Sequence, residues 1–279
     1  MSAARHTTVS GGRSRRRLSR TFSRARWGEY RRLLRAAKDN GYTILALEDW
    51  VENDPDTGGP SLILRHDVDQ HPASALRMAR IEEEMGVRST WYFRWRTAHP
   101  VVIARLRSGG FAVGLHYETM TRRLLAAGRD PSEEESSLER SRGILRDEIA
   151  AFERLFGPIR SVTPHGDSRL PSVSNAELLR DESCADYGID FDGNEAMAGR
   201  GLAYWLTDRS RVEGGWKDAV APEQLFERRL SPVLCLTHPN NWASGPGLWL
   251  DRVLRAVLPP TGGRGGRRPI RTGSDDPPL

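Results

Sequence analysis

Histidine and aspartate side chains follow several apolar runs of this sequence, each at the end of its run. Six residues stand at such ends: Asp67, Asp69, His116, His165, Asp208 and His238. In parallel α/β folds the carboxyl ends of the strands converge on one face, so side chains delivered there can form a single site. An aspartate with two histidines suits Zn²⁺, Fe²⁺, Mn²⁺ or Co²⁺ and leaves a coordination position for water. The pattern predicts a metal site with hydrolytic chemistry.

The stretch 65–69, Arg-His-Asp-Val-Asp, places two carboxylates one residue apart directly after an apolar run. Two such carboxylates repel, and burying either is costly unless a cation accompanies it. A metal resolves the difficulty if one aspartate binds it while the other takes a proton from water, and a further histidine can protonate the leaving group. His66 alternates with Asp67, so we expect it on the opposite side of the strand in a structural role.

Taken singly, these residues have structural interpretations. An aspartate after a strand is commonly a turn or helix cap, and a histidine there is commonly a hydrogen-bonded structural residue. The inference of a site therefore depends on the set.

Helix-like and strand-like segments alternate along the chain. We expect helices over 27–41, 72–86, 100–110, 131–157, 175–182, 222–230 and 247–258, and strands over 42–47, 62–64, 88–93, 111–116, 161–165, 187–191, 202–208 and 231–238. This alternation favours a parallel α/β architecture, and both an open sheet and a closed barrel fit it.

Charge is unevenly distributed in the 279 residues. The first 26 contain eight Arg and no acidic residue, and the last 21 have a net charge of +2, so the body 27–258 carries −5 of the total +5. We expect a folded domain over 27–258 between a basic disordered tail, 1–26, and a second disordered tail, 259–279. A mildly acidic body argues against a nucleic-acid-binding domain. An alternative function for the basic tail is docking on an anionic partner.

No apolar segment follows the basic start, and no window has the roughly 20 apolar residues of a membrane span. We expect a cytoplasmic protein without a secretory signal or membrane span. The two cysteines, Cys184 and Cys235, lack metal-binding spacing, and Cys235 lies in an apolar run as a core residue does.

Five motifs occur in a recognisable order: ILRHDVD, GLHYE, TPHGD, LTDRSRVEGGW and LTHPNNW. The ordered set resembles the polysaccharide deacetylase superfamily, in particular a divergent branch with Arg-His-Asp-Val-Asp, over roughly residues 22 to 257. The resemblance implies an α/β fold, a distorted (β/α) barrel usually of seven strands, and metal-dependent removal of acyl groups from amino sugars.

The resemblance also implies roles for single residues. Asp67 matches the catalytic base, Asp69 the metal-binding aspartate, His116 the first metal-binding histidine and His238 the general acid. Asp208 and Trp216 match an acidic residue and a tryptophan that support this histidine and the acetyl pocket. We expect Trp216 and Trp242 to bind substrate.

Two departures from the family pattern matter. The usual second histidine, four residues after His116, is Met120 here, so we assign the third ligand to His165. Asp-Val-Asp replaces an Asp-Asp pair, which leaves open whether Asp67 or Asp69 binds the metal.

We therefore expect an N-deacetylase that holds one divalent transition metal, with Zn²⁺ first and Fe, Mn or Co as alternatives. Its partner is a small-molecule or glycan substrate, and its oligomeric state is left open. The alternative is a catalytically inactive, saccharide-binding relative.

Overall fold

The structure is a computed structural model that describes residues 24–52, 58–127, 134–166, 174–208, 216 and 221–246. The tails 1–23 and 247–279, and with them the helix expected over 247–258, lie outside the described residues. No helix in the described ranges is long and apolar enough to cross a bilayer.

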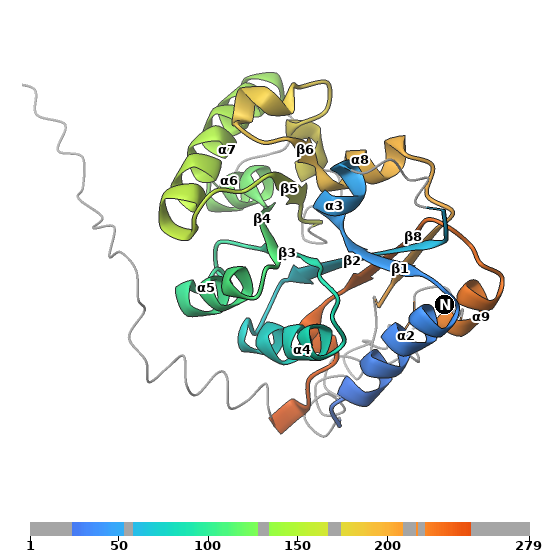
Figure 1. Ribbon diagram of the computed structural model, residues 1–279. Helices are drawn as coiled ribbons and strands as arrows, with labels where there is room; N and C mark the ends of the chain where they lie inside the picture. Colours follow the sequence, from blue (N-terminus) through green and yellow to red (C-terminus); the bar gives the residue numbers. More distant parts are fainter. Residues whose placement is uncertain are drawn as a thin grey trace, which may run out of the picture.

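A curved parallel sheet forms the centre of the molecule (Figure 1). Its strands are β1 (Thr43–Ala46), β2 (Ser61–Val68), β3 (Thr90–Phe93), β4 (Ala112–Tyr117), β5 (Ser161–Pro164), β6 (Phe191–Asp192), β7 (Tyr204–Thr207) and β8 (Val233–Thr237). Seven of them follow the order β6-β5-β4-β3-β2-β8-β7, and β1 pairs with β2 as an eighth. Since no pairing of β6 with β7 is found among the described residues, the sheet is a half-barrel. The expected distorted (β/α) barrel is confirmed.

Helices connect the strands and cover the outside of the sheet (Figure 1). They are α2 (Trp27–Asp39), α3 (Leu47–Glu52), α4 (Ala73–Glu84), α5 (Pro100–Ser108), α6 (Thr119–Ala127), α7 (Glu134–Phe156), α8 (Gly193–Gly199) and α9 (Pro222–Glu227), with 3₁₀ turns η1 (Asn175–Leu178), η2 (Cys184–Tyr187) and η3 (Pro239–Asn241). The turn η1 replaces most of the helix expected over 175–182. The sequence patterns did not predict α3, α6 or α8.

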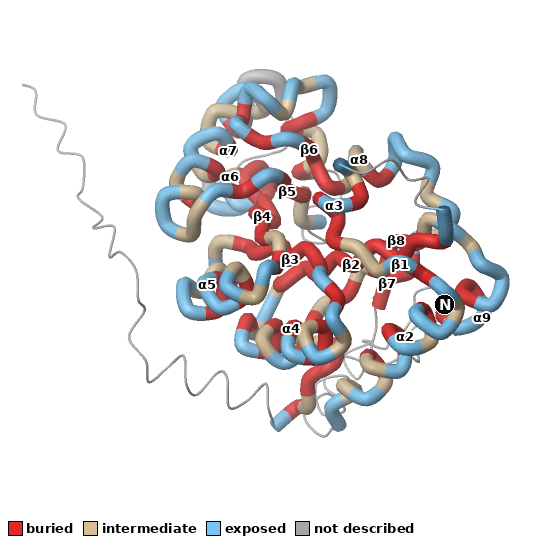
Figure 2. The backbone as a smooth tube through the Cα atoms, viewed as in Figure 1, coloured by how far each residue is buried: buried red, intermediate tan, exposed pale blue. Residues whose placement is uncertain are grey.

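Strand β2 organises the site because it is central and every one of its residues is buried (Figure 2). Its first half pairs with β1 and its second half with β3, while β8 pairs along the other edge. Leu62, Leu64 and Val68 join the core between sheet and helices, whereas Ile63 joins a second core with Tyr92 and Leu234. Because side chains alternate along a strand, residues 65 and 67 share the inner face with Ile63.

The second core, on the inner face of the sheet, is covered by α3. Its residues Leu47 and Trp50 pack against Ile63, Tyr92 and Leu234. These apolar side chains fill the interior of the half-barrel toward the amino ends of the strands. The remaining inner positions, toward the carboxyl ends of the strands, carry the polar side chains of the site.

Candidate metal centre

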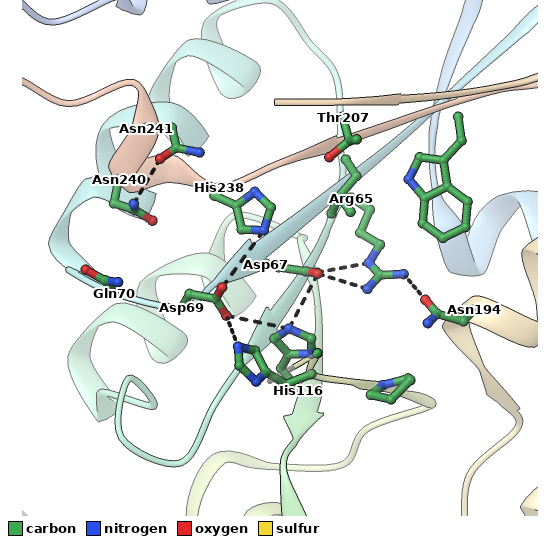
Figure 3. Close-up of a pocket in the computed structure, with 15 residues that line it drawn as sticks. Arg65, Asp67, Asp69, Gln70, His116, Asn194, Thr207, His238, Asn240 and Asn241 are labelled. Carbon is green, nitrogen blue, oxygen red and sulfur yellow. Dashed lines mark hydrogen bonds and ion pairs between the residues drawn. The ribbon is translucent and has the colours of Figure 1, made fainter. Parts of the chain in front are cut away.

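A cavity of about 460 Å³ opens at the carboxyl ends of the strands (Figure 3). Its lining residues come from strands or from the segments that directly follow them: Arg65, Asp67, Asp69, Gln70, His116, Pro164, His165, Gly166, Asn194, Trp205, Thr207, Leu236, His238, Asn240 and Asn241. Five of the six residues expected at strand ends line it, and the sixth, Asp208, contacts His238 from behind.

Asp69, His116 and His165 bring three possible ligand atoms together, all within 4.8 Å of one another. Asp69 Oδ1 lies 3.5 Å from His116 Nε2 and 3.6 Å from His165 Nε2. The same oxygen is buried and has no hydrogen-bond partner among the described residues. Donors bound tetrahedrally at about 2.1 Å from a common ion lie roughly 3.4 Å apart, so this spacing fits a metal.

The tautomer of His116 suits a ligand. Its Nδ1 donates to the carbonyl oxygen of Thr163 at 3.0 Å, and since a carbonyl only accepts, Nε2 is left with its lone pair toward Asp69. Burial lowers the pKa of His116, and this effect exceeds the opposite effect of the charges of Asp67 and Asp69. The lowered pKa favours the neutral ring that binds a metal.

His165 reaches the site from the turn after β5. Its backbone N–H donates to the carbonyl of Tyr117 at 2.8 Å, and its own carbonyl accepts from Asn175 Nδ2 at 2.7 Å. Its ring packs edge-on against His116, with centroids 5.1 Å apart. Met120, at the position where the resembled family has its second histidine, is buried in the outer core.

The two aspartates differ in their surroundings. Both oxygens of Asp67 accept from Arg65, Nε to Oδ1 and Nη2 to Oδ2, each at 2.9 Å. Burial alone would raise the pKa of Asp67, but the charge of Arg65, followed by that of His116, lowers it. Burial would also raise the pKa of Asp69, yet His165, His116 and His238 hold it well below its usual range. The geometry thus favours Asp69 as the metal ligand and leaves Asp67 bound to a fixed cation.

His238 stands opposite this group on the turn after β8. Its Nδ1 lies 2.7 Å from Asp208 Oδ1, and its Nε2 lies 3.9 Å from Asp69 Oδ2. Burial alone would lower the pKa of His238, but the hydrogen bond and charge of Asp208 dominate and raise it to about 9. The raised pKa favours the protonated ring, which can donate a proton.

Trp242 and Trp216, which we expected to bind substrate, are not among the described residues that line the cavity. Trp242 is 2% exposed and donates its indole N–H to Asp208 Oδ2 at 2.7 Å. Trp216 packs against Trp242, with ring centroids 5.9 Å apart. The structure gives Trp242 a supporting role behind Asp208. Trp205, 40% exposed on β7, is the tryptophan that lines the cavity.

His66 points away from the cavity, as its alternation with Asp67 predicted. Its Nδ1 lies 2.6 Å from Thr237 Oγ1 and its Nε2 lies 2.7 Å from Glu82 Oε1, and its ring lies against Trp91. It belongs to the packing between β2 and α4.

The sequence patterns missed several cavity residues, among them the two that hold Asp67 in place, Arg65 and Asn194. Arg65 was not expected to take part in the site. It lies two residues before Asp67, however, and residues two apart on a strand share one face. Asn194, on the unexpected helix α8, accepts from Arg65 Nη1 at 2.7 Å. No residue spacing in the sequence points to Asn194, because only the folded sheet brings α8 beside β2.

No protein-family model and no curated protein sequence matches this chain. Solved structures similar to it include a mutant of a CE4 family pseudoenzyme from Bacillus anthracis with restored enzymatic activity. It is 16% identical, with 72% of this chain and 62% of that chain covered and a TM-score of 0.42. This chain thus spans under two thirds of that protein.

Two further similar structures are family 4 carbohydrate esterases. One, from Bacillus anthracis, is 13% identical over 80% of this chain and 84% of that chain, with a TM-score of 0.39. The other, from Streptomyces lividans in complex with acetate, is 18% identical over 71% and 88%, with a TM-score of 0.37. These proteins fall in the superfamily that the sequence motifs resemble.

Proposed function

We propose that this protein is a metal-dependent hydrolase that cleaves a carbon–nitrogen amide bond, with an N-acetylated sugar or glycoside intermediate as substrate. One observation carries the proposal. The ligand group Asp69, His116 and His165 shares a cavity with a second carboxylate, Asp67, and with a histidine held by an aspartate, His238.

Asp69, His116 and His165 would hold one divalent transition metal. The mixed oxygen and nitrogen donors suit Zn²⁺ first, with Fe²⁺, Mn²⁺ and Co²⁺ as alternatives. When bound, such an ion polarises an acyl carbonyl and lowers the pKa of a water molecule toward neutrality. The remaining chemistry requires a proton acceptor and a proton donor, and the cavity contains a candidate for each.

Asp67 is the proposed general base. The two hydrogen bonds from Arg65 fix its carboxylate, and the lowered pKa keeps the group ionised, so its oxygens carry no proton of their own. Its Oδ2 lies 3.5 Å from His116 Nε2, which places it directly beside the ligand group. A water molecule in the cavity can therefore lose its proton to Asp67 as it attacks the acyl carbon.

His238 is the proposed general acid. Asp208 holds its Nδ1, so Nε2 is the nitrogen that faces the ligand group. A raised pKa, about 9, keeps the proton on the ring until an amine leaves. Protonation of that nitrogen by His238 completes cleavage of the amide, and Asp208 then stabilises the ring for its next proton.

The test is acetate release from methyl N-acetyl-β-glucosaminide by protein loaded with Zn²⁺. We expect turnover by the wild type and a loss of about 100-fold or more in kcat for Asp67→Asn and for His238→Gln, since each removes one proton-transfer group. Asp186→Asn, at an exposed position on η2, is the matched control and should retain full activity. Saccharide binding that survives Asp67→Asn in a protein without metal or turnover would favour the inactive, saccharide-binding relative.

A further inference from the structure

Asn194 presents a hydrogen-bond donor to the cavity because its neighbours fix the direction of its amide. Arg65 Nη1 donates to Asn194 Oδ1 at 2.7 Å, and Thr163 Oγ1 donates to the same oxygen at 3.1 Å. A guanidinium group has only donors, so the amide cannot be reversed without facing N–H against N–H. The Nδ2 hydrogens are therefore left for another acceptor, and no described residue takes them.

Asn240 presents an acceptor for a similar reason. The carbonyl oxygen of Asp208 accepts from Asn241 Nδ2 at 2.9 Å, and a carbonyl cannot donate, so this bond fixes the direction of Asn241. Asn241 Oδ1 then accepts from Asn240 Nδ2 at 3.2 Å. This chain of hydrogen bonds ends at Asn240 Oδ1, which is buried and has no partner among the described residues. A buried oxygen without a donor is costly, so it calls for a donor from outside the chain.

The two amides lie on opposite sides of the proposed catalytic groups (Figure 3). Asn194 is joined to Asp67 through Arg65, and Asn240 follows His238 by two residues. Both line the cavity. A ligand whose amide lies between Asp67 and His238 would meet a donor on one flank and an acceptor on the other.

Resting on the proposed function, we propose that Asn194 and Asn240 determine substrate specificity in favour of an N-acylated amino sugar. Asn194 Nδ2 donates to an oxygen of the sugar, and Asn240 Oδ1 accepts from one of its hydroxyl groups. An N-acylated amine without hydroxyl groups leaves Asn240 Oδ1 unpaired and is rejected. Sites that hydrogen-bond a substrate hydroxyl discriminate strongly against analogues that lack it.

Three variants separate recognition from structure. Asn194→Asp keeps an oxygen that accepts from Arg65 and Thr163 but removes the donor, and Asn194→Ala removes both without adding charge. Asn240→Leu removes the acceptor at similar size. Gln224→Ala removes an exposed amide on α9 and is the control.

The experiment compares two substrates that share the acetamide and a six-membered ring: methyl N-acetyl-β-glucosaminide and N-acetylcyclohexylamine. We measure kcat/KM for both with protein loaded with Zn²⁺, together with zinc content. We expect the wild type to prefer the sugar by about 100-fold or more. Each Asn194 or Asn240 variant should lose about 10- to 100-fold on the sugar, the value of one hydrogen bond to a buried group, with little change on the cyclohexyl amide.

Equal losses on both substrates, or no loss on either, would overturn the specificity proposal and leave the proposed function standing. A wild type that cleaves both amides equally well would do the same. A wild type that contains zinc but cleaves neither, or that holds no zinc, would overturn the proposed function and the specificity proposal with it.

Discussion

His238 is bonded to Asp208 through Nδ1, at 2.7 Å, so that only Nε2 faces the ligand group. The second carboxylate oxygen of Asp208 accepts from Trp242, and its carbonyl accepts from Asn241. Trp242 thus fixes the carboxylate of Asp208 and Asn241 fixes its backbone, and the carboxylate in turn fixes the ring of His238. The arrangement predicts that Asp208 acts on catalysis through His238 alone.

Asp208→Asn should therefore lower kcat by about 100- to 10,000-fold, the range for loss of a positioned general acid, because the ring loses both its charge partner and its orientation. KM and zinc content should change little, since Asp208 is not a ligand. Steady-state kinetics and metal analysis check this, with Asp186→Asn as control. Loss of zinc in Asp208→Asn would contradict the assigned role.

Arg65→Met should destabilise the protein and impair catalysis together. Removal of the guanidinium group leaves the buried carboxylate of Asp67 without its partner, which costs about 3–5 kcal/mol in the free energy of unfolding. Arg105→Met breaks the exposed pair with Glu83, at 2.7 Å, and should cost far less because solvent screens that pair. Urea unfolding of both variants tests the difference. Similar losses would show that Arg65 is not essential for holding Asp67.

Glu48 gives a pH dependence of stability that is independent of the metal ligands. Burial raises its pKa, although Thr90 and Ser161 donate hydrogen bonds to the carboxylate. A carboxyl whose folded pKa is raised stabilises the fold fully only below its unfolded pKa, and this contribution is lost as the pH rises through the folded pKa. Glu48→Gln should remove that loss, so its free energy of unfolding relative to wild type should increase as the pH rises above about 4, the ordinary pKa of a glutamate.

Urea unfolding across this pH range, without metal, measures the difference between the two proteins. A constant difference would mean that Glu48 titrates alike in the folded and unfolded chain.

Gly114→Ala should destabilise the inner core. A Cβ at this position would lie 2.5 Å from the carbonyl oxygen of Ser161 and 2.5 Å from the ring of Tyr92. Overpacking costs typically about 1–3 kcal/mol, and a backbone contact cannot rotate away. Gly143→Ala, on α7 with open space around it, should instead stabilise by roughly 0.5–1 kcal/mol. Thermal unfolding distinguishes them, and a neutral Gly114→Ala would show that β4 can shift.

The sequence permitted prediction of the sheet and the meeting of its polar ends, because both follow from local patterns. Alternation along β2 separates His66 from Asp67, and the convergence of parallel strands brings His116, His165 and Asp69 together. The place of His165 beside Asp69 and His116 was likewise predictable, because it follows β5 at the same edge of the sheet.

The roles of Asn194, Trp242 and Trp205 depend on contacts between distant segments, so no local sequence pattern indicates them. Asn194 lies on a helix of seven residues that the sequence did not predict, and its role depends on Arg65, 129 positions earlier. We expected Trp242 to bind substrate, yet α2 covers it: the rings of Trp242 and Tyr30 lie 5.4 Å apart. The exposure of Trp205 likewise depends on the fold, since it lies on β7, the strand at one end of the sheet.

The metal centre is the central claim, and metal content by inductively coupled plasma mass spectrometry tests it most directly. The wild type is measured beside His116→Ala, His165→Ala and the control His99→Ala, at the start of α5. We predict about one transition-metal ion per chain in the wild type and in His99→Ala, and loss of the metal in both site variants, since three protein ligands complete such a centre. A wild type that holds no metal after reconstitution, or a His165→Ala variant that keeps it, would contradict the assigned centre.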